Sequence, residues 1–140
     1  MLVRQLMTAS PITLTPDATL EHALDRMVRY EIHEIHVVED DAVVGIVTDR
    51  DLKMLLGPGT RRIDPDLLDP TALNLDVSFA MTPEVETIRA DAPLSLAARM
   101  LLELRVGALP VEDENGKLVG ILSVTDLLRW SLQVFEAAEG

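Results

Sequence analysis

The sequence contains no cysteine among its 140 residues. This absence excludes disulfide bonds, thiolate metal ligands and cysteine nucleophiles, and it leaves the redox compartment open. Aromatic residues are also scarce, because the chain has only Tyr30, Phe79, Trp130 and Phe135. Four rings are too few for the stacking platforms that bind single-stranded nucleic acid, so the core must be aliphatic.

Positive charge is in short supply as well: 12 Lys and Arg stand against 24 Asp and Glu, a formal net charge of −12. So acidic a chain repels a phosphate backbone, and we expect no nucleic-acid partner. The longest apolar runs, such as 42–47, fall far short of the roughly 20 residues of a membrane helix, and no signal peptide is visible at the start. We therefore expect a cytoplasmic protein without a membrane partner.

Motifs of known catalytic sites are missing too. The sequence has no Gly-x-Ser-x-Gly, no His-Glu-x-x-His and no P-loop, and these are the patterns that place a nucleophile, a zinc ion or a phosphate. No pair of carboxylates stands out as a general acid and base. We expect no enzymatic activity and no required cofactor, although 48% hydrophobic residues are enough to build a real core.

An internal repeat dominates what is present. Matching residues recur 74 positions apart and then 75 apart, which places a one-residue insertion near Asn115-Gly116. The clearest matches are Met7-Thr8 with Met81-Thr82, Asp17-Ala18 with Asp91-Ala92, Gly45-Ile46 with Gly120-Ile121, and Asp51-Leu52 with Asp126-Leu127. We predict a first repeat over 1–56, a connector over 57–80, a second repeat over 81–131 and a C-terminal tail over 132–140.

Hydrophobic periodicity changes in the same order within each repeat. Short alternating stretches predict strands at 12–14 and 85–88, and helical spacing follows from Leu20 and from Leu94. Next come two strands around an acidic turn and a second helix from Asp49 and from Val124. Each repeat is therefore predicted to have the element order β-α-β-β-α, and the fold class is α+β. One repeat alone leaves a face of its sheet open, and two copies together can cover that face. The tail could extend the last helix or fray.

The same short motif precedes the second helix of each repeat. Thr48 is followed by Asp51, and Ser123 by Asp126, at the spacing of an N-cap and an acid that reaches back to it. A helix N-terminus also offers free amides to an anion, and a carboxylate can accept two hydrogen bonds from a ribose diol. The motif is therefore compatible with a simple helix cap and with a nucleotide site.

In their order and duplication these residues resemble the CBS-domain pair, also called a Bateman module. The resemblance rests on the paired Met-Thr starts, on Thr-Pro-Asp-Ala-Thr-Leu at 15–20, on 105–111, and on the two Gly-φ-φ-Thr/Ser-x-x-Asp endings, where φ is apolar. It covers nearly the whole chain, and the first half is similar to acetoin-utilisation-type CBS proteins. It implies a pseudo-two-fold fold with clefts between the repeats for AMP, ADP, ATP or S-adenosylmethionine, and a homodimer with an unidentified protein target.

The resemblance also implies roles for individual residues. Ribose would be held by Asp51 and Asp126; phosphate by Thr48, Ser123 and Thr125, with Arg50 and His33 as basic neighbours; and adenine near Ile12, Ile32, Glu86 and Val106. His36 stands where the second repeat has Pro110, so the first cleft departs from the family pattern. The alternative function is a dimerisation or protein-interaction module whose caps are only caps.

Three further features have ordinary explanations. His33 and His36 lie three apart and make a poor metal pair in a strand, so we expect no metal site. Arg50, Lys53, Arg61 and Arg62 form the only basic concentration, which could attract polyphosphate or simply be offset by nearby carboxylates. Five methionines are expected to fill gaps in the core or at a module interface, namely those at 7, 27, 54, 81 and 100.

Overall fold

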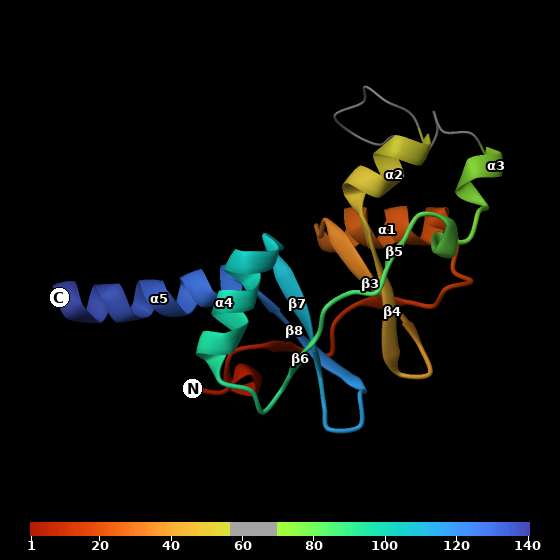
Figure 1. Ribbon diagram of the computed structural model, residues 1–140. Coiled ribbons are helices and arrows are strands. Elements are labelled where there is room, and N and C mark those ends of the chain that lie inside the picture. Colours follow the sequence, from red (N-terminus) through yellow and green to blue (C-terminus); the bar gives the residue numbers. More distant parts are fainter. Residues whose placement is uncertain (57–69) are drawn as a thin grey trace. The chain divides into compact units, whose positions relative to one another are not determined.

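The computed structural model describes residues 1–56 and 70–140, and its internal contacts divide the chain into two units (Figure 1). Unit 1 combines Met1–Pro11 with Glu86–Gly140, and unit 2 is Ile12–Val85. The first eleven residues of the chain therefore belong with the second sequence repeat. In the described ranges, no helix is both long and apolar enough to cross a membrane.

Unit 2 is built on a four-stranded sheet in the order β2-β3-β4-β5. Strand β2 runs parallel to β3, and the pairs β3–β4 and β4–β5 are antiparallel. Its elements are β2 (Thr13–Leu14), α1 (Leu20–Tyr30), β3 (Glu34–Glu39), β4 (Ala42–Thr48), α2 (Asp49–Leu56), α3 (Pro70–Leu73), the 3-10 helix η3 (Val77–Phe79) and β5 (Thr82–Pro83).

Unit 1 repeats this plan with a sheet in the order β1-β8-β7-β6. Strand β6 is parallel to β7, and the pairs β7–β8 and β1–β8 are antiparallel. Its elements are the 3-10 helix η1 (Val3–Gln5), β1 (Thr8–Ala9), β6 (Ile88–Arg89), α4 (Leu94–Leu104), β7 (Ala108–Glu112), β8 (Leu118–Ser123) and α5 (Val124–Glu139). The predicted α+β class and the β-α-β-β-α order are confirmed.

The structure corrects the sequence prediction at the ends of elements. The strand predicted over 85–88 begins only at Ile88, because the preceding Glu86 is exposed and joins no ladder. The two-residue edge strands β1 and β5 were not predicted at all. The open question of the tail is answered by α5, which continues to Glu139.

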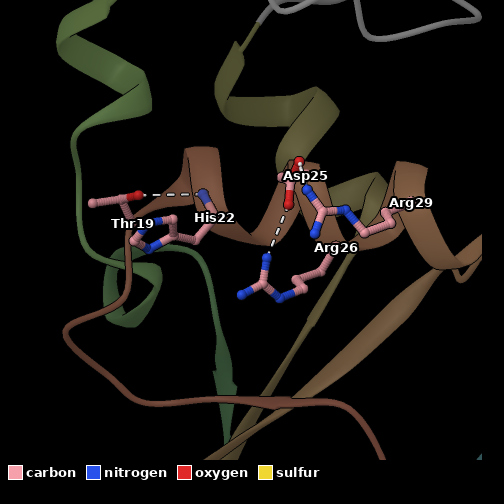
Figure 2. Close-up of polar contacts among 5 residues, drawn as sticks. All are labelled: Thr19, His22, Asp25, Arg26 and Arg29. Carbon is pink, nitrogen blue, oxygen red and sulfur yellow. Dashed lines mark hydrogen bonds and ion pairs between the residues drawn. The ribbon is translucent and has the colours of Figure 1, made fainter.

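Helical spacing puts the apolar residues of each first helix on one face. In α1 these are Leu20, Ala23, Leu24 and Met27, and they pack in a core with the inward residues of β3 and β4, Ile35, Val37 and Val47. In unit 1 the equivalent core contains Leu94, Ala97, Leu101, Leu109, Val111 and Leu122. Figure 2 shows the opposite, exposed side of α1, where Asp25 pairs with Arg26 at 2.9 Å and with Arg29 at 3.5 Å.

The repeated glycines are required by close packing of the repeated methionines. A Cβ on Gly45 would lie 2.6 Å from Met81 Sδ, and a Cβ on Gly120 would lie 2.6 Å from Met7 Sδ. The Met-Thr pair that opens the first sequence repeat therefore packs over Gly120 of the second repeat. The pair that opens the second repeat packs over Gly45 of the first. The expectation that methionines fill gaps in the core holds for these two. Met54 is 75% exposed and lies outside the core, so its place at a module interface stays a prediction.

The hairpin turns explain the change in repeat offset. The β3–β4 turn uses Asp40 and Asp41 at φ 51° and 67°, whereas the β7–β8 turn uses Gly116 at φ 80°. In the longer turn, the backbone N–H groups of Asn115 and Lys117 donate to Asp113 Oδ1. The left-handed region favours glycine, so the aspartates of the first turn occupy a conformation that costs most side chains energy.

Candidate functional site

The start of α2 carries the first of the two predicted caps. The Thr48 N–H and the Thr48 hydroxyl both donate to Asp51 Oδ2, each at 2.9 Å, and the Asp51 N–H donates to Thr48 Oγ1 at 3.2 Å. These bonds satisfy the backbone N–H groups of Thr48 and Asp51, which would otherwise lack an acceptor at the start of the helix. In the part of the chain that the structure describes, no hydrogen bond reaches the second carboxylate oxygen, Asp51 Oδ1.

The start of α5 carries the matching cap with a different pattern of bonds. The Ser123 N–H donates to Asp126 Oδ2 at 2.9 Å, and the Asp126 N–H donates to Ser123 Oγ at 3.1 Å. The second carboxylate oxygen, Oδ1, accepts from the Thr8 hydroxyl of β1 at 3.4 Å. The Ser123 hydroxyl is therefore free to donate, while the outer carboxylate oxygen already has a neighbour.

A loop before each hairpin is tied to the same helix start. The Asp49 N–H donates to the His33 carbonyl at 2.8 Å, and the Val124 N–H donates to the Gly107 carbonyl at 2.9 Å. These bonds bring Ile32 and Val106, the predicted adenine neighbours, beside the helix starts. Ile32 is half-buried against the core of unit 2, whereas Val106 is 41% exposed.

The other two predicted adenine neighbours lie just before the parallel edge strands. Ile12 precedes β2 and is half-buried, and Glu86 lies two residues before β6 and is exposed. No hydrogen bond in the described residues links either of them to a cap. Their role at the site stays a prediction.

Charged side chains surround the α2 cap. Asp49 pairs with His33 Nδ1 at 3.2 Å and with Lys53 Nζ at 3.8 Å. Burial, and next the charge of Asp49, raise the pKa of the Glu34 carboxyl above its usual range. The contact with Asp49 engages His33 Nδ1, so it competes with the predicted contact of His33 to phosphate. In unit 1 the positions equivalent to His33 and Asp49 are Gly107 and Val124.

Among the other predicted phosphate contacts, Arg50 and Thr125 are placed on the first turns of α2 and α5. Arg50 directly follows Asp49 and is exposed, and Thr125 follows Val124 and is exposed as well. Both therefore lie within the turn where backbone N–H groups are free to meet an anion. Arg61 and Arg62, which complete the basic concentration of the sequence, lie outside the described residues.

His36 is the buried polar side chain that the sequence reasoning did not anticipate. It is fully buried, and neither ring nitrogen has a hydrogen-bond partner among residues 1–56 and 70–140. It sits in β3 between Thr13 of β2 and Ile46 of β4, and burial lowers its pKa to about 4. The imidazole is therefore neutral at physiological pH. Within the described residues, no group of three or more His, Cys, Asp and Glu side chains is placed to hold a metal ion.

An open pocket of about 200 Å³ borders the α5 cap. It is lined by Leu6, Asp126, Arg129, Trp130 and Gln133. A carboxylate, a guanidinium and an indole thus meet on one side of α5, a combination that can take a polar, flat ligand group. Sequence reasoning missed Arg129 and Trp130, although both follow Asp126 by one helical turn.

The fold and the two caps place the chain among known proteins. The family model for the CBS domain matches residues 3–57 and 76–133. The chain therefore belongs to the CBS domain family and carries a pair of these domains, as its repeats predicted.

Individual relatives agree with this assignment. A CBS domain-containing protein of Dictyostelium discoideum is 36% identical over 137 residues, which cover 96% of this chain and 94% of the relative. The crystal structure of CBSX2 in complex with AMP has a TM-score of 0.77 and 30% identity, covering 95% of this chain and 97% of that one. A structure described as that of an acetoin utilization protein (AcuB) from Vibrio cholerae has a TM-score of 0.80 and 25% identity, covering 99% and 96%.

Proposed function

We propose that this protein is a non-enzymatic regulatory module that binds an adenosine-containing ligand, AMP, ADP, ATP or S-adenosylmethionine, at its two helix caps. The observation that carries the proposal is the repeated cap itself, with a hydroxyl and a carboxylate held at the start of α2 and again at the start of α5. The AMP complex of CBSX2, which is similar over nearly the whole chain, supports the choice of ligand class.

The proposed chemistry at the α2 cap uses the free oxygen of Asp51. Oδ2 remains bonded to the helix start, while Oδ1 accepts the two hydroxyl groups of the ribose. The Thr48 hydroxyl at present donates to Asp51, so it must rotate to reach a phosphate oxygen. Arg50 supplies a nearby positive charge, and His33 contributes only when it leaves Asp49. Ile12 and Ile32 are the proposed apolar wall for adenine.

At the α5 cap the proposed phosphate contact needs no bond to be broken, whereas the proposed ribose contact does. The Ser123 hydroxyl accepts from Asp126 but can donate its own proton to phosphate without breaking a bond. Asp126 Oδ1 must first release the Thr8 hydroxyl, whose 3.4 Å bond is long and therefore weak. Thr125 adds a second hydroxyl, and Glu86 and Val106 are the proposed neighbours of adenine.

Regulation requires that the ligand bind two conformations with different affinity. We propose that a homodimer in the cytoplasm is the unit that changes conformation, and that an unidentified protein target recognises the change. The chain itself carries out no reaction in this proposal.

Thermal unfolding against a ligand panel tests the proposal. AMP, ADP, ATP and S-adenosylmethionine are added separately at millimolar concentration, with GMP as the control nucleotide. A ligand at 100 times its Kd stabilises the folded state by about 2.7 kcal/mol, which gives a visible rise in Tm. Absence of a shift with every adenosine compound contradicts the proposal and favours an interaction module without a nucleotide.

Substitutions at the cap separate binding from folding. Asp51→Asn keeps one oxygen for the Thr48 N–H but puts an amide donor where the ribose needs an acceptor, so we expect loss of ligand affinity with little loss of stability. The matched control is Thr19→Ala, which removes the N-cap of α1 (Figure 2), whose hydroxyl oxygen accepts from the His22 N–H at 3.2 Å. It should cost about 1 kcal/mol of stability and leave the ligand's Kd unchanged.

A further inference from the structure

A pocket of about 230 Å³ lies in unit 1 at the turn end of the β7–β8 hairpin. Its lining comes from η1, from β6 and the two residues after it, and from the β7–β8 turn, and it consists of Arg4, Arg89, Ala90, Asp91, Asp113 and Glu114. Strand β8 runs from this turn to the α5 cap, and its six residues span about 17 Å. The pocket is therefore separate from the helix caps of the proposed function.

Backbone hydrogen bonds hold the walls of this pocket in place. The Arg4 N–H donates to the Ala90 carbonyl at 3.0 Å, and the preceding Val3 is fully buried. The Ala90 N–H in turn donates to the Glu112 carbonyl at 2.9 Å. On the other wall, Asp113 Oδ1 accepts from two backbone N–H groups of the turn. The walls are thus preorganised, which lowers the entropy that a ligand loses on binding.

The two walls carry opposite charge. Arg4 and Arg89 lie on the wall formed by η1 and β6, where Arg89 pairs with Asp91 at 3.1 Å. Asp113 and Glu114 lie on the wall formed by the turn. Among the described residues, no ion pair joins Arg4 or Glu114 to another side chain. A guanidinium and a carboxylate therefore line the same small pocket without contacting each other.

Unit 2 has a pocket at the equivalent place, but without these cations. Its volume is about 440 Å³, and it is lined by Thr15, Pro16, Asp17, Val38, Glu39 and Asp40. Thr15 stands where unit 1 has Arg89, and Ser78 stands where unit 1 has Arg4. The Ser78 N–H donates to the Pro16 carbonyl, as the Arg4 N–H does to Ala90. The fold therefore forms this pocket twice, with acidic residues in both, whereas the two arginines are specific to unit 1.

Charge and volume together indicate the ligand. A simple anion is repelled by the carboxylates of the turn, and a simple cation is repelled by the Arg4 guanidinium. A zwitterion, which has a carboxylate and an ammonium group, finds a charged partner on both walls. Pockets for drug-sized ligands have volumes of about 300–1,000 Å³, so 230 Å³ suits a smaller molecule than an adenosine compound.

We propose that this pocket binds a small free amino acid, in addition to the ligand of the helix caps. The Arg4 guanidinium donates to the carboxylate of the amino acid, and the Glu114 carboxylate accepts from its ammonium group. Asp113 Oδ2 is a second acceptor for the ammonium group, because the turn engages only Oδ1. The inference goes beyond the proposed function and does not depend on which adenosine compound binds.

Calorimetric titration of the full chain tests the site. Glycine, β-alanine and γ-aminobutyrate carry their two charges at increasing separation and serve as probes at millimolar concentration. At least one of them should bind. Its N-acetyl derivative lacks the ammonium group and its amide lacks the carboxylate, so each should bind about tenfold more weakly or worse. Failure of all three probes, or equal binding of either derivative, overturns the inference.

Variants of the lining residues connect the binding to this pocket. Arg4→Gln and Glu114→Gln should each raise the Kd of the probe by about tenfold or more, and both chains should remain folded because the two side chains are exposed. Asp40→Asn is the matched control, because Asp40 is the unit 2 equivalent of Glu114 and asparagine accepts its positive φ. It should leave the Kd unchanged. A probe that binds Arg4→Gln as tightly as the wild type overturns the inference.

Discussion

The caps of α2 and α5 are built from the same residue types, yet they leave different atoms free. In unit 2 no described residue donates to the carboxylate oxygen Asp51 Oδ1, while the Thr48 hydroxyl is engaged. In unit 1 the Ser123 hydroxyl can donate, while Asp126 Oδ1 contacts Thr8. Among the described residues, the duplicated motif thus leaves a carboxylate oxygen without a bond at α2 and a hydroxyl proton without an acceptor at α5.

The largest expected difference between the two units is the loss of folding stability at acid pH. His36 of unit 2 is buried with its pKa lowered to about 4 from 6.5, and unit 1 has Pro110 in its place. The unfolded chain therefore binds more protons than the folded one between these values, so stability falls as pH falls. We expect a loss of about 3 kcal/mol between pH 7.5 and pH 4 from this group. Urea unfolding at several pH values measures it.

Substitution of the histidine provides the control for that experiment. In His36→Gln the part of the pH dependence that lies between about 6.5 and 4 should disappear, whereas exposed His22→Gln should retain it. Glu34 acts in the opposite direction, because its raised pKa stabilises the folded form at low pH and this contribution is lost as pH rises. Unchanged pH dependence in His36→Gln would contradict the assignment.

An effect of similar or smaller size is expected at the two close-packed glycines. Alanine at Gly120 meets Met7 Sδ at 2.6 Å and the Thr8 carbonyl at 2.8 Å, whereas alanine at Gly45 meets Met81 Sδ at 2.6 Å and the Thr82 carbonyl at 3.1 Å. A flexible thioether can move more easily than a backbone carbonyl. We therefore expect Gly120→Ala to cost about 3 kcal/mol and Gly45→Ala about 1–2 kcal/mol, measured by urea unfolding.

The partner side chain distinguishes the two sources of strain. Shortening the methionine in Met81→Ala/Gly45→Ala should recover most of the cost of the glycine change. Met7→Ala/Gly120→Ala should recover less, since the Thr8 carbonyl remains in place. Equal recovery in both units would show that the backbone contact at Gly120 has no cost of its own.

The smallest effect is expected from Thr8. Thr8→Val removes a long, exposed hydrogen bond, so unfolding free energy should change by no more than about 0.5 kcal/mol. It also frees Asp126 Oδ1, and calorimetric titration with AMP should then show tighter binding at the α5 cap. Thr82→Val is the matched control at the equivalent position of β5, and a similar gain in affinity there would contradict the role given to Thr8.

Features encoded over a few neighbouring residues could be predicted from the sequence. The helices from Leu20, Asp49, Leu94 and Val124 follow from apolar spacing, and both caps follow from a Thr or Ser placed three residues before an Asp. The family and the α+β class followed from the order of these signals. The adenosine ligand and the residue roles stay predictions.

Contacts between distant residues could not be predicted in the same way. Thr8 and Asp126 are 118 positions apart, so no local pattern connects them. The edge strands β1 and β5 have two residues each, too few for an alternation to be recognised. The sequence analysis identified His36 only as a departure from the family pattern, and only the sheet register shows it between Thr13 and Ile46.

The membership of the first eleven residues in unit 1 has a consequence for synthesis on the ribosome. Unit 2 ends at Val85, so all of its strands have been made by the time the chain reaches that point. Strand β1 pairs Thr8 with Ile121, and its partner is translated more than a hundred residues later. Met7 and its neighbours therefore leave the ribosome long before the strand against which they pack has been made.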